Sequence, residues 1–356
     1  MRPPIFIVGS MRSGSTMLRL ILDSHENIAI GPETGFVGAL SATTVIPGWK
    51  YGGEWYERIG WSADELDERL REFYSGMFAR YAASQGKTRW GDKTPFHTWH
   101  IAEMARVFPD AMFLGLVRHP GAVVSSLRAR FHYDLAEAAK YWASINTELV
   151  RQGSLLGPRF VLCRYEGLVR APEAVTRRLM GWLGEPWSPN LLEHHRIQPA
   201  KGAPPLVDGH TSTRDAVDAS RATRWLDNTS AADLAELSRL CAGLPEFLGY
   251  EMDAPAALLE IGDVGTAGVP DGDDLAVRMK EWSERVDFSP PPPAVNPDAS
   301  VEDLARRALR AEEALQRMRN RRVVRISDSL RRAQRNRSVK DLRDAVRILA
   351  GRDDRV

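Results

Sequence analysis

Short apolar runs alternate with amphipathic stretches along the first half of the chain. The run PIFIV at 4–8 ends at a glycine, and apolar residues at helical spacing follow over 15–24. The same order of strand and helix recurs at 111–131 and at 159–184. Strands that alternate with helices predict a parallel sheet covered by helices on both faces. We therefore expect an α/β fold with three layers.

Two parts of the chain depart from this alternation. Residues 41–90 contain a cluster of aromatic residues and a charged helical stretch near 63–83, which we interpret as an insertion over the sheet. After residue 253, the stretch 254–299 is rich in Gly, Asp and Pro and contains SPPPPAVNPDAS, which predicts an extended linker. Residues 300–356 carry apolar residues four and three apart, typical of a short coiled coil. We expect a compact catalytic domain over 1–253, this linker, and a helical tail over 300–356.

Charge is distributed unevenly along a chain whose net charge is only +1. Residues 300–356 hold 17 Lys and Arg against 9 Asp and Glu, a net charge of +8, which leaves −7 for residues 1–299. A basic amphipathic tail favours self-association, an acidic partner or an anionic membrane surface. It lacks the interleaved aromatic residues that would favour nucleic-acid binding, so we expect none.

Membrane spans and disulfide frameworks are not expected from this sequence. The longest apolar runs are far shorter than the roughly 20 residues that a membrane span needs, and MRPPIFIVG runs into a strand without the apolar segment of a secretory signal. The two cysteines, Cys163 and Cys241, are too few for a disulfide framework or a metal cluster. We expect a cytoplasmic protein, with peripheral membrane contact through the tail as an alternative.

The sequence IFIVGSMRSGSTMLRL has the pattern of a phosphate-binding loop. Gly9 and Gly14 are separated by four residues, and Ser15 and Thr16 open the following helix, whose first amides can bind an anion. A nucleoside-triphosphate loop would carry lysine directly before the hydroxyl pair. Here the cation comes earlier, at Arg12. A P-loop-type fold with a different anionic ligand is the interpretation that fits these residues.

These residues resemble the sulfotransferases that use 3′-phosphoadenosine 5′-phosphosulfate (PAPS), in their protein-tyrosine and bacterial branches. RSGST resembles that family's 5′-phosphosulfate loop, and VRHPGAVVSSLRAR resembles its 3′-phosphate motif. RYEGLV and ASRATRWLD resemble two later segments near the nucleotide. The resemblance implies that the donor is bound by Arg12, Ser13, Gly14, Ser15, Thr16, Arg118, Ser126, Arg130, Tyr165 and Arg224. A 3′-phosphate also suits a guanidinium and a hydroxyl on independent chemical grounds.

The resemblance also implies catalytic residues. In LDSHENIAIGPET, Glu33 stands where the protein-tyrosine branch has its general base, and in GDKTPFH, Lys93 would assist the leaving group together with Arg12. Some branches use a histidine two positions after this lysine, where Pro95 stands here, so His97 is a secondary candidate for the base. Because cationic side chains can balance the charge of a sulfuryl group, we expect no metal.

The predicted function is transfer of the sulfuryl group of PAPS to a hydroxyl of a carbohydrate or glycolipid, a small metabolite or a tyrosine. The sequence does not distinguish these acceptors. One alternative is a non-catalytic nucleotide-binding scaffold assembled through the C-terminal helices. Another is a nucleotide kinase, for which the loop lysine is missing.

Overall fold

The computed structural model describes residues 2–35, 37–38, 56–200, 215–241 and 243–252. The aromatic cluster around residue 50, the predicted linker 254–299 and the predicted tail 300–356 lie outside the described residues. No helix within the described ranges is long and apolar enough to cross a membrane.

A five-stranded sheet forms the centre of the described fold, with the strand order β2-β3-β1-β4-β5. All neighbouring strands are parallel. The strands are β1 (Ile5–Gly9), β2 (Ile28–Ile30), β3 (Arg89–Lys93), β4 (Met112–Val117) and β5 (Phe160–Arg164). The strands are almost wholly buried because helices cover both faces. The predicted α/β class with a central parallel sheet is confirmed.

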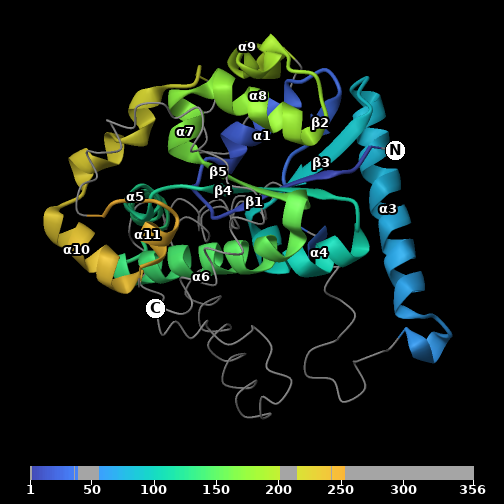
Figure 1. Ribbon diagram of the computed structural model, residues 1–356, viewed down its shortest axis with the longest axis horizontal. Coiled ribbons are helices and arrows are strands. Elements are labelled where there is room, and N and C mark those ends of the chain that lie inside the picture. Colours follow the sequence, from blue (N-terminus) through green and yellow to red (C-terminus); the bar gives the residue numbers. More distant parts are fainter. Residues whose placement is uncertain (1, 36, 39–55, 201–214, 242, 253–356) are drawn as a thin grey trace, which may run out of the picture. The chain divides into compact units, whose positions relative to one another are not determined.

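One face of the sheet, here called the α1 side, is covered by α1 (Ser15–Asp23), α7 (Tyr165–Arg170) and α8 (Pro172–Leu183) (Figure 1). Ile5 and Ile7 of β1 pack there, and α9 (His194–Ala200) contacts α1. The predicted strand and helix segments at 4–24 and 159–184 are confirmed. Gly14 takes a left-handed conformation at the start of α1, and Gly184 does so at the end of α8.

The opposite face, the α6 side, is covered by α4 (Ile101–Val107) and α6 (Leu135–Gly153) (Figure 1). Phe6 and Val8 pack there. The other helices that contribute to this core are α3 (Ala63–Ser84), α5 (Pro120–Phe131), α10 (Ala231–Leu240) and α11 (Leu244–Phe247). Capping boxes begin α3 at Ser62 and α6 at Asp134. Each N-cap side chain accepts from the N3 amide, and the side chain of the N3 glutamate accepts from the N-cap amide.

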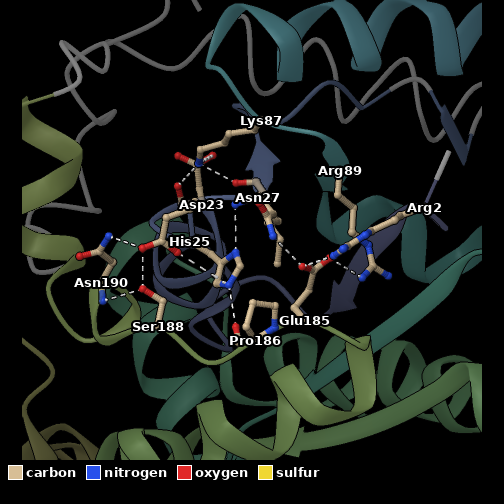
Figure 2. A network of polar contacts seen from close by, with 12 residues as sticks. Arg2, Asp23, His25, Asn27, Lys87, Arg89, Glu185, Pro186, Ser188 and Asn190 are labelled. Carbon is tan, nitrogen blue, oxygen red and sulfur yellow. Dashed lines mark hydrogen bonds and ion pairs between the residues drawn. The ribbon is translucent and has the colours of Figure 1, made fainter.

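Strand β3 was not foreseen, because its sequence RWGDK holds one large apolar residue. Its polar side chains are nevertheless buried, and each has a distant partner. Arg89 donates to Glu185, Asp92 accepts from Thr34, and Lys93 pairs with Glu33 (Figure 2 shows the Arg89 contact). Burial of charge is tolerated where it is paired or hydrogen-bonded in this way. The partners come from two other segments, which hydrophobic periodicity cannot reveal.

Candidate functional site

The predicted site residues gather at the carboxyl edge of the sheet, defined as the ends of the strands at Gly9, Ile30, Lys93, Val117 and Arg164. Glu33 follows β2, Arg118 follows β4 and Tyr165 follows β5. Open parallel sheets bind ligands at this edge, between two neighbouring strands whose following helices lie on opposite faces of the sheet. Strands β1 and β4 meet this condition, since α1 lies on the α1 side and α5 on the α6 side.

The loop between β1 and α1 is shaped by its two glycines. Gly9 has φ 146° and Gly14 has φ 97°. A Cβ on Gly9 would overlap the carbonyl of Leu116, and one on Gly14 would overlap the ring of Tyr165. Arg12, between them, also has a positive φ of 67°. Since no side chain caps α1 at Gly14, the first amides of that helix are not taken by an N-cap.

Two side chains from the α6 side hold the backbone of this loop by hydrogen bonds. Thr98 Oγ1 accepts from the Gly9 amide at 2.8 Å, and Tyr141 Oη accepts from the Met11 amide at 2.9 Å. Neither residue was foreseen from sequence, because a single hydroxyl on a helical stretch carries no motif. Their bonds hold the backbone in place while leaving the helix start open to a ligand.

Arginine side chains converge beside the loop. Arg12 Nε donates to Ser126 Oγ at 2.8 Å, across 114 positions of sequence. Burial lowers the pKa of Arg12, and the positive charges of Arg118 and Arg130 lower it further. These guanidinium groups remain charged at neutral pH. The structure thus brings four predicted donor-binding residues together, and the positive charges repel one another.

Arg118 is held through its backbone and its side chain. Its guanidinium donates to the carbonyls of Arg12 (3.3 Å) and Arg221 (3.1 Å), and its Cζ lies 4.2 Å from the centre of the Tyr165 ring. Trp142 Nε1 donates to the Arg118 carbonyl at 3.0 Å. Within the described chain Arg118 has no ion pair. Its charge is therefore available to an anionic ligand.

The residue after Arg118 anchors the following helix. His119 Nδ1 accepts from the Gly121 amide at 3.1 Å and caps α5. Burial lowers the pKa of His119 to about 3, so the imidazole is neutral at physiological pH. Its ring stacks on Trp225 with centroids 4.4 Å apart. This packing joins Arg118 to the segment that contains Arg221 and Arg224.

Lys93 connects the loop to Glu33. Its ammonium donates to Thr16 Oγ1 at 3.1 Å and forms an ion pair with the Glu33 carboxylate. The Lys93 side chain is 2% exposed, whereas that of Glu33 is 47% exposed. Burial lowers the pKa of Lys93, against the opposing effect of Glu33. A buried ammonium thus lies between the phosphate-type loop and a carboxylate that solvent can reach.

His97 lies apart from solvent. It is 0% exposed, its Nε2 is 2.7 Å from Asp92 Oδ2, and its Nδ1 accepts from the Gly38 amide at 3.3 Å. Both ring nitrogens are therefore engaged by protein groups. The alternative base from the sequence and the preferred base, Glu33, differ sharply in access to a substrate.

In the segment 219–227, Arg221 and not the predicted Arg224 contacts Arg118. Arg224 is 65% exposed in its side chain and donates to Asp218 and Ser220. Arg221 instead offers its carbonyl to Arg118, and its charge acts on Tyr165. The sequence signal for both is one arginine-containing stretch, ASRATR, which does not distinguish them.

Three buried polar atoms test whether this edge fits an anionic nucleotide. Ser10 Oγ, Ser13 Oγ and Arg118 Nε have no hydrogen-bond partner among the described residues. All three can donate a hydrogen bond, and unsatisfied buried donors are costly unless a ligand completes them. Phosphate and sulfate oxygens are suitable acceptors, so the residues present fit such a group.

Known proteins with similar sequence point to the same chemistry. The model of the sulfotransferase family matches residues 3–189. The putative protein-tyrosine sulfotransferase of Caenorhabditis briggsae is 25% identical over 257 residues, which cover 69% of this chain and 89% of that protein. Protein-tyrosine sulfotransferase 1 of Danio rerio is 25% identical over 265 residues, which cover 71% of this chain and 73% of that protein.

Solved structures include a similar sulfotransferase domain, from the Synechococcus PCC 7002 olefin synthase. Its TM-score is 0.49 and its identity 24%, over 70% of this chain and 97% of that chain. The family model spans more than half of the present sequence. The chain therefore belongs to the sulfotransferase family, and the prediction that it is an enzyme of this class is confirmed.

Proposed function

We propose that this enzyme transfers the sulfuryl group of PAPS to an acceptor hydroxyl, with Glu33 as the general base. The observation that carries the proposal is the position of Lys93. Its ammonium contacts both Thr16 of the phosphate-type loop and the Glu33 carboxylate. Donor loop and base are thus joined through one buried cation, as a direct transfer between two bound substrates requires.

The donor nucleotide would be held at both of its anionic ends. We assign the 5′-phosphosulfate to the loop Arg12–Ser13–Gly14–Ser15–Thr16 and the open start of α1. We assign the 3′-phosphate to Arg118, Ser126 and Arg130, because Arg12 and Ser126 already meet at 2.8 Å beside Arg118. Tyr165, which packs against Arg118, would border the nucleotide. Arg224 would reach it only by leaving Asp218.

The chemistry assigned to this chain is proton transfer and charge stabilisation. PAPS supplies an activated sulfuryl group, whose sulfur gains a bond to the acceptor oxygen and loses the bond to the 5′-phosphate. Glu33 accepts the proton of the acceptor hydroxyl, for which its 47% exposed side chain is accessible. Lys93 and Arg12 stabilise the negative charge on the departing phosphate oxygen. The prediction that no metal is needed is checked by turnover in the presence of EDTA.

The names of the relatives suggest which acceptor to test first. The curated relatives named above are protein-tyrosine sulfotransferases, which makes a tyrosine peptide the first acceptor to try. A carbohydrate or glycolipid and a small phenolic or alcoholic metabolite complete the panel. At all of these, the reacting group is a hydroxyl, as the base assignment requires.

Incubation with ³⁵S-labelled PAPS and this acceptor panel tests the proposal. We expect label in one acceptor class with the wild-type protein, and about 10³-fold less with Glu33→Gln. An exposed glutamate of α10, Glu236, provides the matched control, since Glu236→Gln should transfer label as the wild type does. Binding of 3′,5′-ADP without transfer to any acceptor would instead support the non-catalytic scaffold.

The domain limits and the tail are also proposed from the sequence. We propose a catalytic domain over 1–253, followed by the linker 254–299 and the tail 300–356, and the last two lie outside the described residues. We propose self-association or contact with an anionic surface through the basic tail. Light scattering on a protein truncated at residue 290 tests the first, and an unchanged oligomeric mass would refute it. The cytoplasmic location stays a prediction.

A further inference from the structure

The segment 31–38, of which the structure describes every residue but 36, carries the proposed base and lies beyond the end of its strand. It follows β2, an edge strand of three residues that pairs only with β3. The register ends at Ile30, which faces Gly91. Strand β3 continues two residues further, to Asp92 and Lys93. From this point the side chains around the end of β3 replace the sheet ladder in holding the segment.

Four contacts tie the segment to residues 92–97. Lys93 pairs with Glu33, and Thr34 Oγ1 donates to Asp92 Oδ2 at 2.9 Å. The Gly35 amide donates to Thr94 Oγ1 at 3.3 Å, and the Gly38 amide donates to His97 Nδ1 at 3.3 Å. A short stretch of the chain thus holds the segment at residues 33–35 and at Gly38.

These contacts approach the segment from both faces of the sheet. Side chains alternate along a strand, so Asp92 lies on the same face as Trp90, the α6 side, where His97 also lies. Lys93 lies on the α1 side, where it contacts Thr16. The segment that carries Glu33 is therefore held between the two faces at the carboxyl edge.

Asp92 and His97 form the centre of this arrangement. A single oxygen, Asp92 Oδ2, accepts from both Thr34 and His97. Because the Gly38 amide donates to Nδ1 of His97, the ring carries its proton on Nε2 and donates it to Asp92. Asp92 is 1% exposed and His97 is 0% exposed. Because both side chains are buried, neither can reach the hydroxyl of an acceptor bound at the surface of the carboxyl edge.

We infer that Asp92 and His97 are positioning residues, which clamp the segment 31–38 so that Glu33 is presented to the acceptor hydroxyl. The clamp itself follows from the contacts, whereas its catalytic consequence rests on the proposed function of Glu33. A base must be held within hydrogen-bond reach of the proton that it removes, and small displacements reduce the rate strongly. His97 therefore acts through Glu33 and not on the substrate.

Hydrogen exchange on the full chain tests the clamp without any acceptor. Thr34→Val removes a donor to Asp92, and His97→Ala removes the partner on the other side. If the contacts act as one unit, Thr34→Val speeds exchange of the Gly38 amide, and His97→Ala speeds exchange of the Gly35 amide, each by about fivefold. Thr88→Val, at an exposed threonine before β3, is the matched control and leaves both unchanged. Independent responses, in which each variant affects only its own contact, would overturn the clamp.

Turnover then separates positioning from proton transfer. His97→Gln keeps a donor for Asp92, so we expect a kcat about tenfold below wild type, a pH profile with the same acidic limb, and an unchanged Kd for 3′,5′-ADP. A loss as large as that of Glu33→Gln, with disappearance of that limb, would make His97 the base and overturn the inference. If the wild-type protein transfers sulfate to no acceptor, the proposed function fails, while the exchange data still decide whether the clamp exists.

Discussion

The two edges of the sheet use charged residues in opposite ways. At the amino edge, where the strands begin, opposite charges are paired: Arg2 and Arg89 both contact Glu185, and Lys87 contacts Asp23 (Figure 2). At the carboxyl edge, like charges converge, and Arg12, Arg118 and Arg130 repel one another. The first arrangement stabilises the fold, and the second attracts an anionic ligand at a cost to the empty protein.

The two edges also differ in whether their buried polar atoms have hydrogen-bond partners. His25 Nε2 bonds the Pro186 carbonyl at 2.8 Å, Asn27 Nδ2 donates to Glu185 at 3.1 Å, and Ser188 donates to Glu26 at 2.7 Å (Figure 2). None of the polar side chains labelled at that edge, all within the described ranges, has a buried atom without a partner. At the carboxyl edge, Ser10, Ser13, Arg118 and His119 each have such an atom. Atoms of this kind also occur elsewhere in the described chain, for example at Asn146, so incomplete hydrogen bonding distinguishes the two edges but is not confined to the functional one.

The largest predicted effect is on turnover at the carboxyl edge. Lys93→Met should lower kcat by about 10³-fold, because it removes the cation that stabilises the leaving phosphate. Its unfolding free energy should be unchanged or higher, since the Lys93 ammonium is buried and Glu33 can be solvated. Urea denaturation beside the sulfate-transfer assay measures both. Wild-type turnover by Lys93→Met would remove Lys93 from the mechanism.

The amino edge should show the reverse pattern. Glu185→Gln should lower the unfolding free energy by about 3 kcal/mol, because Arg89, 1% exposed in its side chain, loses a charged partner. The Kd for 3′,5′-ADP should stay unchanged under conditions where the variant is folded. Glu236→Gln, which breaks an exposed pair with Arg239, should leave stability unaltered. Weakened nucleotide binding by folded Glu185→Gln would contradict the separation of the two edges.

A smaller effect is expected from Arg118→Lys. Lysine cannot reproduce the planar guanidinium, so the affinity for 3′,5′-ADP should fall about 30-fold while that for 5′-AMP changes little. Arg128→Lys, in the helix α5 that follows Arg118, is 45% exposed in its side chain and serves as the control. Calorimetry measures both nucleotides. Equal losses for 3′,5′-ADP and 5′-AMP would show that Arg118 does not contact the 3′-phosphate.

The smallest effect is the acid sensitivity of the amino edge. Burial raises the pKa of Glu185, but hydrogen bonds from Arg2, Asn27 and Arg89 outweigh it, and the pKa is lowered overall. The stability from Glu185 is thus fully present above the unfolded-state pKa, about 4.3, and is lost as the pH falls through the lower folded pKa. Over this range, roughly pH 5 to 3, the unfolding free energy of the wild type should fall more steeply than that of Glu185→Gln. Parallel slopes would refute the linkage.

The sequence predicts the apolar part of the fold well. The segments around β1, β4 and β5 are short apolar runs followed by amphipathic helices, and the structure confirms them. The helix Leu135–Gly153 was missed, as was β3, whose Arg89, Asp92 and Lys93 look unsuited to a central strand. The burial of these three residues depends on Glu185, Thr34 and Glu33, and no local pattern encodes pairing over such separations.

For the site, the sequence motifs name residue types but not their arrangement. The motifs identify Arg12, Arg118 and Ser126 as a set, and the structure places them together. The same motifs do not show that Lys93 pairs with Glu33, or that His97 is enclosed by Asp92 and Gly38. These contacts depend on the strand order, which places β3 between β2 and β1.

Calorimetric titration of the wild-type protein with 3′,5′-ADP and with 5′-AMP tests the central claim most directly. The claim is that Arg118 and Arg130, at the carboxyl edge, bind the 3′-phosphate of the donor nucleotide. The account predicts that 3′,5′-ADP binds about 100-fold more tightly than 5′-AMP, because charged hydrogen bonds to that phosphate are made only by the former. Equal affinity for the two nucleotides, or no binding of 3′,5′-ADP, would contradict it.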